Sequence, residues 1–171
     1  MTIEDAIKTA LEFENKVHAL YEKAAHDARD TAAKKVFTVL AQEEAGHVAY
    51  LESRLTEWQK DGHIAPEKVR TVLPSAERVR AAVSRLQQQM HKPAGSHDAE
   101  LASLQQALQA EDQTSAFYQQ MVRELPAQGQ ELFARFLAIE ESHAAVVQAQ
   151  IDNVKQMGFW FDMKEFDLEI G

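Results

Sequence analysis

Hydrophobic side chains recur along most of the chain every three or four residues, the spacing that places them on one face of an α-helix. No long stretch alternates hydrophobic and polar residues in the way that a half-buried strand would. The pattern predicts an all-α protein with four long helices and one shorter helix. We expect the long helices over about residues 2–28, 31–61, 98–125 and 128–157, and the shorter one over about 75–90.

Polar and conformationally special residues stand where these helices should begin and end. Thr2 can cap the first helix, and Asp30 or Thr31 can cap the second, because a short side-chain oxygen accepts a hydrogen bond from the first turn. Gly62 suits the C-terminal end of the second helix. Pro126 should end the third, since proline cannot continue a helix.

The long helices form two pairs, separated by a connection over about residues 62–97 that contains three of the four prolines. Structureless connections of this length are uncommon in compact domains. This one is long enough to cross the whole length of a helix pair, and it contains the shorter predicted helix. We therefore expect an antiparallel four-helix bundle with one long crossover, built as a single domain over residues 1–171. The tail over 159–171 is aromatic and acidic, and we expect it to pack on a surface.

One pattern of polar residues occurs twice. Each copy has a glutamate, a tyrosine seven residues later, and a Glu-x-x-His motif about thirty residues after the first glutamate. The first copy consists of Glu14, Tyr21, Glu44 and His47. The second copy consists of Glu111, Tyr118, Glu140 and His143.

The positions of the turns agree with this duplication. Two residues of an antiparallel helix pair lie at one height when the turn falls midway between them. The midpoint between Glu14 and Glu44 is residue 29, and the midpoint between Glu111 and Glu140 lies between residues 125 and 126. Both midpoints coincide with predicted turns, so each glutamate should face its Glu-x-x-His motif near the middle of the bundle.

These residues interrupt apolar helix faces, where an isolated charge would be very costly. Four carboxylates and two imidazoles that meet in a core predict a pair of divalent cations as their common partner. Oxygen and nitrogen ligands suit iron or manganese. We predict the metal ligands to be Glu14, Glu44, His47, Glu111, Glu140 and His143.

Four residues near the predicted ligands each allow more than one interpretation. Glu43 and Glu141 adjoin the assigned glutamates, but only the three-residue spacing occurs in both halves, so we expect them beside the inner face. Tyr21 and Tyr118 lie two helical turns beyond their glutamates. Their hydroxyls could hydrogen-bond ligand carboxylates across the bundle, which would orient those ligands and give the tyrosines a catalytic role. The alternative is that they are ordinary core aromatics.

Charge and composition narrow the functions further. The net charge of −9 argues against nucleic acid or an anionic membrane surface as a partner, because no basic stripe is present. The absence of cysteine excludes disulfides and Cys-ligated iron–sulfur centres. Neither a secretory leader pattern nor an apolar run of membrane-spanning length is visible, so we expect the protein in the cytoplasm.

At these motifs the chain resembles the rubrerythrin family of the ferritin-like superfamily. The resemblance rests on Glu14-Asn-Lys-Val-His-Ala-Leu-Tyr21, Gln42-Glu-Glu44-Ala-Gly-His47, Ile139-Glu140-Glu-Ser-His143 and the segment from Gly158 to Asp162. It implies a ferritin-like bundle with two iron ions, or two manganese ions in their place, that reacts with hydrogen peroxide or dioxygen. Rubrerythrins add a rubredoxin-type domain with Cys-ligated iron. Without cysteine, this chain would need an external electron donor, and we expect a homodimer or small homo-oligomer.

The chain departs from rubrerythrins at one ligand position. Rubrerythrins tend to carry an additional glutamate one turn after the third-helix ligand, where this chain has Thr114. The remaining six-ligand set is more similar to that of bacterioferritin. An iron-binding or storage protein with ferroxidase activity is therefore the alternative function. A third alternative is a helical interaction module that has lost its metal. The intact motifs in both halves argue against it.

Overall fold

The computed structural model describes residues 1–64, 69–87, 97–157 and 160. These residues form five α-helices, and none of them lies in a β-strand. The helices are α1 (Ile3–Asp27), α2 (Thr31–Asp61), α3 (Ala76–Gln87), α4 (Asp98–Glu124) and α5 (Ala127–Met157). The expectation of an all-α chain with four long helices and one short one is confirmed. Residues 88–90, at the end of the predicted short helix, lie outside the described residues.

Local hydrogen bonds explain where the helices begin and end. The Thr2 hydroxyl accepts a hydrogen bond from the backbone N–H of Asp5 at 3.1 Å. The Asp30 carboxylate accepts from the N–H groups of Ala32 and Ala33. At the end of α2, Gly62 has a φ of 68°, a left-handed conformation that costs glycine little. The caps predicted at these positions are therefore present.

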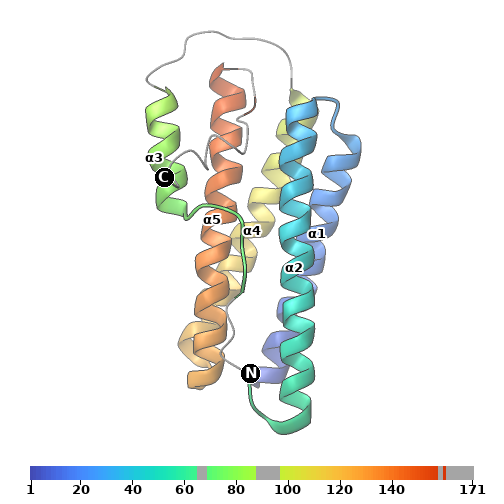
Figure 1. The fold of residues 1–171 in the computed structure, drawn as a ribbon, viewed down its shortest axis with the longest axis vertical. Helices are drawn as coiled ribbons and strands as arrows, with labels where there is room; N and C mark the ends of the chain where they lie inside the picture. Colours follow the sequence, from blue (N-terminus) through green and yellow to red (C-terminus); the bar gives the residue numbers. More distant parts are fainter. Residues whose placement is uncertain (65–68, 88–96, 158–159, 161–171) are drawn as a thin grey trace.

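The four long helices lie side by side (Figure 1). α1 packs against both α2 and α4, and α4 packs against α5. α3 lies outside this group and packs on α5, where Val79 contacts Val146 and Ala149. Two large apolar clusters fill the space between the long helices. One includes Phe37 and Leu104, and the other contains Ile7, Phe133 and Phe136 among its members.

Hydrogen bonds at the two ends of the molecule define the path of the chain. The Glu100 carboxylate, near the start of α4, accepts from the N–H groups of Arg29 and Asp30 in the α1–α2 turn. At the other end, the N–H of Ile64, just after α2, donates to the Gln128 side chain at the start of α5. The connection between α2 and α4 therefore runs from one end of the helix group to the other.

Part of this connection and of the C-terminal tail is described. Residues 69–75 lead up to α3, and Leu73 is buried in the same cluster as Phe37. In the tail, Trp160 is 6% exposed and meets the Phe37 ring edge-on at 5.6 Å between centroids. The rest of the predicted tail, 159 and 161–171, lies outside the described residues. Among the helices of the described part, none combines the length and apolar character needed to cross a membrane.

Candidate metal centre

A layer of polar residues separates the two apolar clusters halfway along the long helices. On α1, Glu14 stands between Ala10 of one cluster and Val17 of the other. On α5, Glu140 stands between Phe136 and Val147 in the same way. The side chains of all six predicted ligands are in this layer, and each residue has an exposed fraction of 0%. A fully buried set of acidic groups requires compensation by protons or cations.

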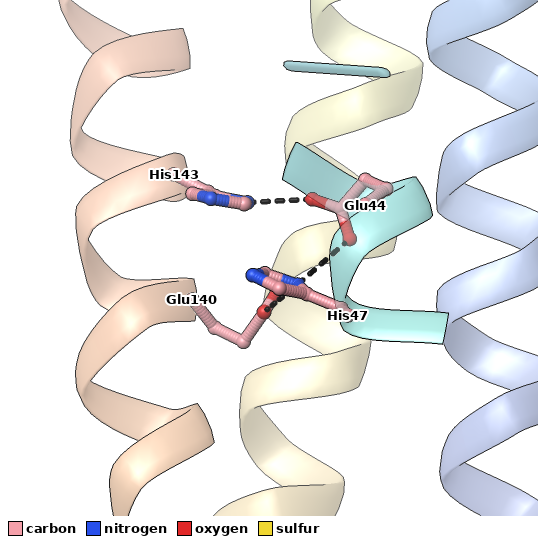
Figure 2. Close-up of side chains that lie close together, drawn as sticks. All are labelled: Glu44, His47, Glu140 and His143. Atoms are coloured by element: carbon pink, nitrogen blue, oxygen red, sulfur yellow. Dashed lines mark hydrogen bonds and ion pairs between the residues drawn. The ribbon is translucent and has the colours of Figure 1, made fainter. Parts of the chain in front are cut away.

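Glu44 joins the two histidines. Its Oε2 lies 3.2 Å from Nδ1 of His47, and its Oε1 lies 2.6 Å from Nδ1 of His143 (Figure 2). The two imidazole rings stack with 5.1 Å between their centroids and an interplanar angle of 12°. One carboxylate from α2 thus contacts a histidine of its own helix and a histidine of α5.

The other three glutamates approach the same two nitrogens. Nδ1 of His47 lies 3.2 Å from Oε2 of Glu14 and 3.4 Å from Oε1 of Glu140. Nδ1 of His143 lies 3.7 Å from Oε1 of Glu111. Each of the four long helices therefore contributes a carboxylate to one continuous cluster. The ligand atoms of Glu44, His47, Glu140 and His143 all lie within 4.8 Å of one another, a group that could hold a metal ion.

The two tyrosines complete the layer by a reciprocal exchange between α1 and α4. The Tyr21 hydroxyl donates a hydrogen bond to Glu111, and the Tyr118 hydroxyl donates to Glu14. Both rings are fully buried. The hydrogen bonds expected across the bundle are present, and they hold the two glutamates, Glu14 and Glu111, that are not part of the group of four. A catalytic role for the tyrosines stays a prediction.

Charge in the layer is shared between carboxylates and imidazoles. Burial, and next the charge of Glu44, raise the pKa of Glu14 to about 8, although the hydrogen bond to His47 lowers it. Burial also raises the pKa of Glu140 above its ordinary value, with Glu14 and Glu44 as the next causes. For His47, burial favours the neutral ring, but hydrogen bonds to Glu14 and Glu44 prevail and raise its pKa to about 9. Protons that these groups retain therefore compensate much of the negative charge.

Glu44 and His143 have the opposite tendencies to ordinary buried groups. Burial opposes ionisation of Glu44, yet the positive charge of His143 outweighs it and lowers the pKa of this carboxyl. Burial likewise favours neutral His143, but the Glu44 carboxylate raises the pKa of the imidazole. The pKa of Glu44 is thus lowered, whereas the pKa values of Glu14 and Glu140 are raised.

The residues fit a bound cation on two counts. Within the described part of the chain, several buried polar atoms of the layer have no hydrogen-bond partner, and such atoms are costly in a protein interior. They include both carboxylate oxygens of Glu140, Oε2 of Glu111, and Nε2 of His47. The donor set also consists only of carboxylate oxygens and imidazole nitrogens, which suit iron and manganese. Metal coordination would satisfy the oxygens that hydrogen bonds leave unpaired.

Glu43 and Glu141, the two glutamates beside the predicted ligands, differ in position from what the sequence predicted for them as a pair. Glu43 lies beside the inner face as expected, and its Oε2 is 3.9 Å from Nε2 of His143. Burial opposes ionisation of Glu43, but His143 and Thr71 outweigh it and lower its pKa. Glu141, for which the same position was expected, is exposed. The position of Glu43, four residues before His47, did not predict that its carboxylate faces His143 of α5.

The Thr114 side chain is bonded to its own helix. It is fully buried, and its hydroxyl donates to the backbone carbonyl of Ala110 at 3.0 Å. This interaction is a common use of a threonine hydroxyl inside a helix. Residue 114 is thus a short side chain bonded to its own helix.

Comparisons of the chain with protein-family models, with curated proteins and with solved structures found no match in any of the three.

Proposed function

We propose that this protein is a ferritin-like di-iron protein of the rubrerythrin type, which reduces hydrogen peroxide or dioxygen with electrons from an external donor. The observation that carries the proposal is the duplicated, fully buried Glu and Glu-x-x-His set, in which Glu44 contacts both histidines. One glutamate from each of two helices and a Glu-x-x-His from each of the other two is the ligand set of di-iron carboxylate bundles.

The chain path supports the ferritin-like part of this proposal. Ferritin-like bundles consist of two helix pairs joined by one long crossover. In this chain the α2–α4 connection leads from the Gln128 end of the helix group to the end that carries Arg29 and Glu100. A crossover of that course makes α4 parallel to α2, so the two halves face each other with their glutamate motifs at one level.

Each residue of the layer has a role in this proposal. Glu44, Glu140 and the two histidines, whose ligand atoms lie within 4.8 Å of one another, would hold the metal ions. Glu14 and Glu111 would be the outer ligands, oriented by Tyr118 and Tyr21. When bound, a pair of ferrous ions would supply the two electrons that reduce one hydrogen peroxide, with two protons, to two waters. The apolar clusters on both sides exclude bulk water from the layer.

Iron storage with ferroxidase activity is the second candidate, and Thr114 favours it. Because this residue adds no seventh ligand, the ligand set is the six-residue one seen in bacterioferritin. Assembly distinguishes the two functions, since storage needs a hollow cage of many subunits, while a rubrerythrin-like protein needs only a dimer or small oligomer. The molecular mass in solution, measured by light scattering after iron loading, discriminates between them.

The direct test is anaerobic loading with ferrous iron, followed by stopped-flow mixing with hydrogen peroxide or with dioxygen. We expect oxidation of two ferrous ions per chain, and sustained turnover only when a reductant is added. The double variant Glu44→Ala/Glu140→Ala should lose the reaction, whereas Glu141→Ala, which removes an exposed neighbouring carboxylate, should retain it. If the loaded protein reacts with neither oxidant, the redox function is wrong.

A further inference from the structure

The two histidines of the metal centre occupy matched places in the duplicated pattern but have different surroundings. Nε2 of His143, the nitrogen that points away from Glu44, faces the Glu43 carboxylate at 3.9 Å. Nε2 of each histidine lacks a direct hydrogen-bond partner in the described part of the chain, but the His47 ring meets the apolar Phe136 edge-on, whereas Nε2 of His143 faces a carboxylate. At the 96-residue offset that relates His47 to His143, the counterpart of Glu43 is the apolar Ile139.

Contacts with the crossover hold the Glu43 carboxylate in place. Its Oε2 accepts a hydrogen bond from the Thr71 hydroxyl, and its Oε1 accepts one from the N–H of Val72 at 3.1 Å. Leu73, the next residue, is buried in the apolar cluster that also contains Val147 of α5. The crossover therefore lies over α2 and α5 at this level, as the segment leading to α3 does in Figure 1. Only 9% of the Glu43 side chain is exposed.

Histidine ligands of metal ions generally donate their second N–H to a carboxylate or a carbonyl, which fixes the ring orientation and makes the ligand nitrogen more basic. Nδ1 of His143 faces the ligand carboxylates, so Nε2 is the nitrogen left for such a partner. A separation of 3.9 Å is longer than a direct hydrogen bond. A small rotation of either side chain, or one bridging water, would connect the two groups.

We propose that Glu43 is a positioning residue for His143, and that it makes the two metal positions unequal, with the His143 position binding a divalent cation more tightly. This inference rests on the proposed function, because it presupposes the two-metal centre. The duplication by itself would give two equivalent positions. The inequality arises from one carboxylate on α2 and from the crossover segment that holds it.

The test is a titration of metal-free protein with Mn²⁺, in which electron paramagnetic resonance measures the unbound ion. We expect two binding steps of different affinity in the wild-type protein. Glu43→Gln keeps the size of the side chain but removes the carboxylate, and it should weaken the tighter step by about 10–100-fold, the usual effect of losing such a partner. The other step should change little, so the two affinities should become more similar.

Two further variants separate positioning from charge and from folding. Glu141→Gln removes the same charge from an exposed site near His143 and should leave both steps unchanged. Thr71→Val removes the hydroxyl that holds Glu43 but keeps the carboxylate, and it should weaken the tighter step by a smaller factor. Circular dichroism checks that each variant is folded before the titration.

The possible failures are distinguishable. Wild-type protein that binds no Mn²⁺ overturns both the proposed function and this inference. Two bound ions, with Glu43→Gln identical to wild type or with both steps weakened equally, overturn only the positioning role of Glu43. An equal effect of Glu141→Gln would show that the net charge, and not the contact with His143, determines the affinity.

Discussion

Tyr118 and Glu14 are 104 residues apart in the sequence, and the tyrosine hydroxyl donates a hydrogen bond to the glutamate in the buried layer. The matched pair, Tyr21 and Glu111, is joined in the same way from the opposite helices. Each half of the duplicated pattern thus orients the outer glutamate of the other half. The two helix pairs depend on each other for the geometry of the centre.

Tyr118→Phe should lower both stability and metal affinity. The change leaves a buried Glu14 oxygen without its donor, which costs about 1–3 kcal/mol of unfolding free energy. Metal affinity should fall about tenfold, because the carboxylate is less well oriented. Urea unfolding and Mn²⁺ titration measure the two effects. Tyr21→Phe, which affects Glu111, is the matched variant and should behave alike. Unchanged metal affinity in both variants would show that the tyrosines are only packing residues.

Metal binding should stabilise the fold. A ligand that binds only the folded state adds about 2.7 kcal/mol at a concentration one hundred times its dissociation constant. The melting temperature measured by calorimetry should therefore rise with Fe²⁺ under anaerobic conditions or with Mn²⁺, and fall back with chelator. Elemental analysis of the loaded protein should give about two metal ions per chain.

The control for this stabilisation is Glu44→Ala/Glu140→Ala, which removes two carboxylates of the compact group of four. Its melting temperature should no longer respond to metal, and its metal content should approach zero. A wild-type melting temperature that is indifferent to iron, manganese and chelator would argue against the buried centre, as would full metal content in the double variant.

Glu100 should contribute stability that disappears in acid. Burial opposes its ionisation, but hydrogen bonds from the N–H groups of Arg29 and Asp30 lower its pKa from the ordinary 4.5. A carboxyl whose pKa is lower in the folded state stabilises that state above the unfolded pKa, and the contribution is lost as the pH falls through the folded value. The contribution is thus complete near neutral pH and declines below about pH 4.5.

Glu100→Gln, compared with wild type by urea unfolding across the pH range, isolates this contribution. The variant should be less stable near pH 7, because hydrogen bonds to a charged acceptor are stronger than those to a neutral one. The difference should shrink toward zero in acid. Glu52→Gln, on the exposed side of α2, should show no such trend. A difference that is constant with pH would contradict the role of the ionised carboxylate.

Thr114→Glu should increase the preference of the iron-loaded protein for hydrogen peroxide over dioxygen. Under the proposed function, the new carboxylate would supply, at a fully buried position, the kind of additional ligand that rubrerythrins tend to carry. Stopped-flow oxidation rates with the two oxidants give the ratio. Thr114→Gln is the matched control, because it adds similar volume without a charge. Wild-type protein that already prefers peroxide strongly, with no change in Thr114→Glu, would show that this position does not set the preference.

The ends of the helices could be predicted because they depend on contacts within one helical turn. Thr2, Asp30 and Gly62 act on their own neighbours, so their residue types were sufficient. The motif residues could be predicted for a related reason. Helical periodicity and the position of a turn determine the height and the face of residues such as Glu14 and Glu44, and both are properties of the linear sequence.

The tertiary structure decided the features that depend on the direction of a side chain between helices. Glu43 and Glu141 adjoin equivalent ligands, yet Glu43 turns toward His143 and the crossover, while Glu141 is exposed. The burial of Glu43 depends on where residues 69–73 cross the helix group. The spacing of the two glutamates along the sequence does not predict that path. The sequence by itself thus determined a symmetric set of six candidate ligands, whereas the packing of the crossover made the surroundings of the two histidines unequal.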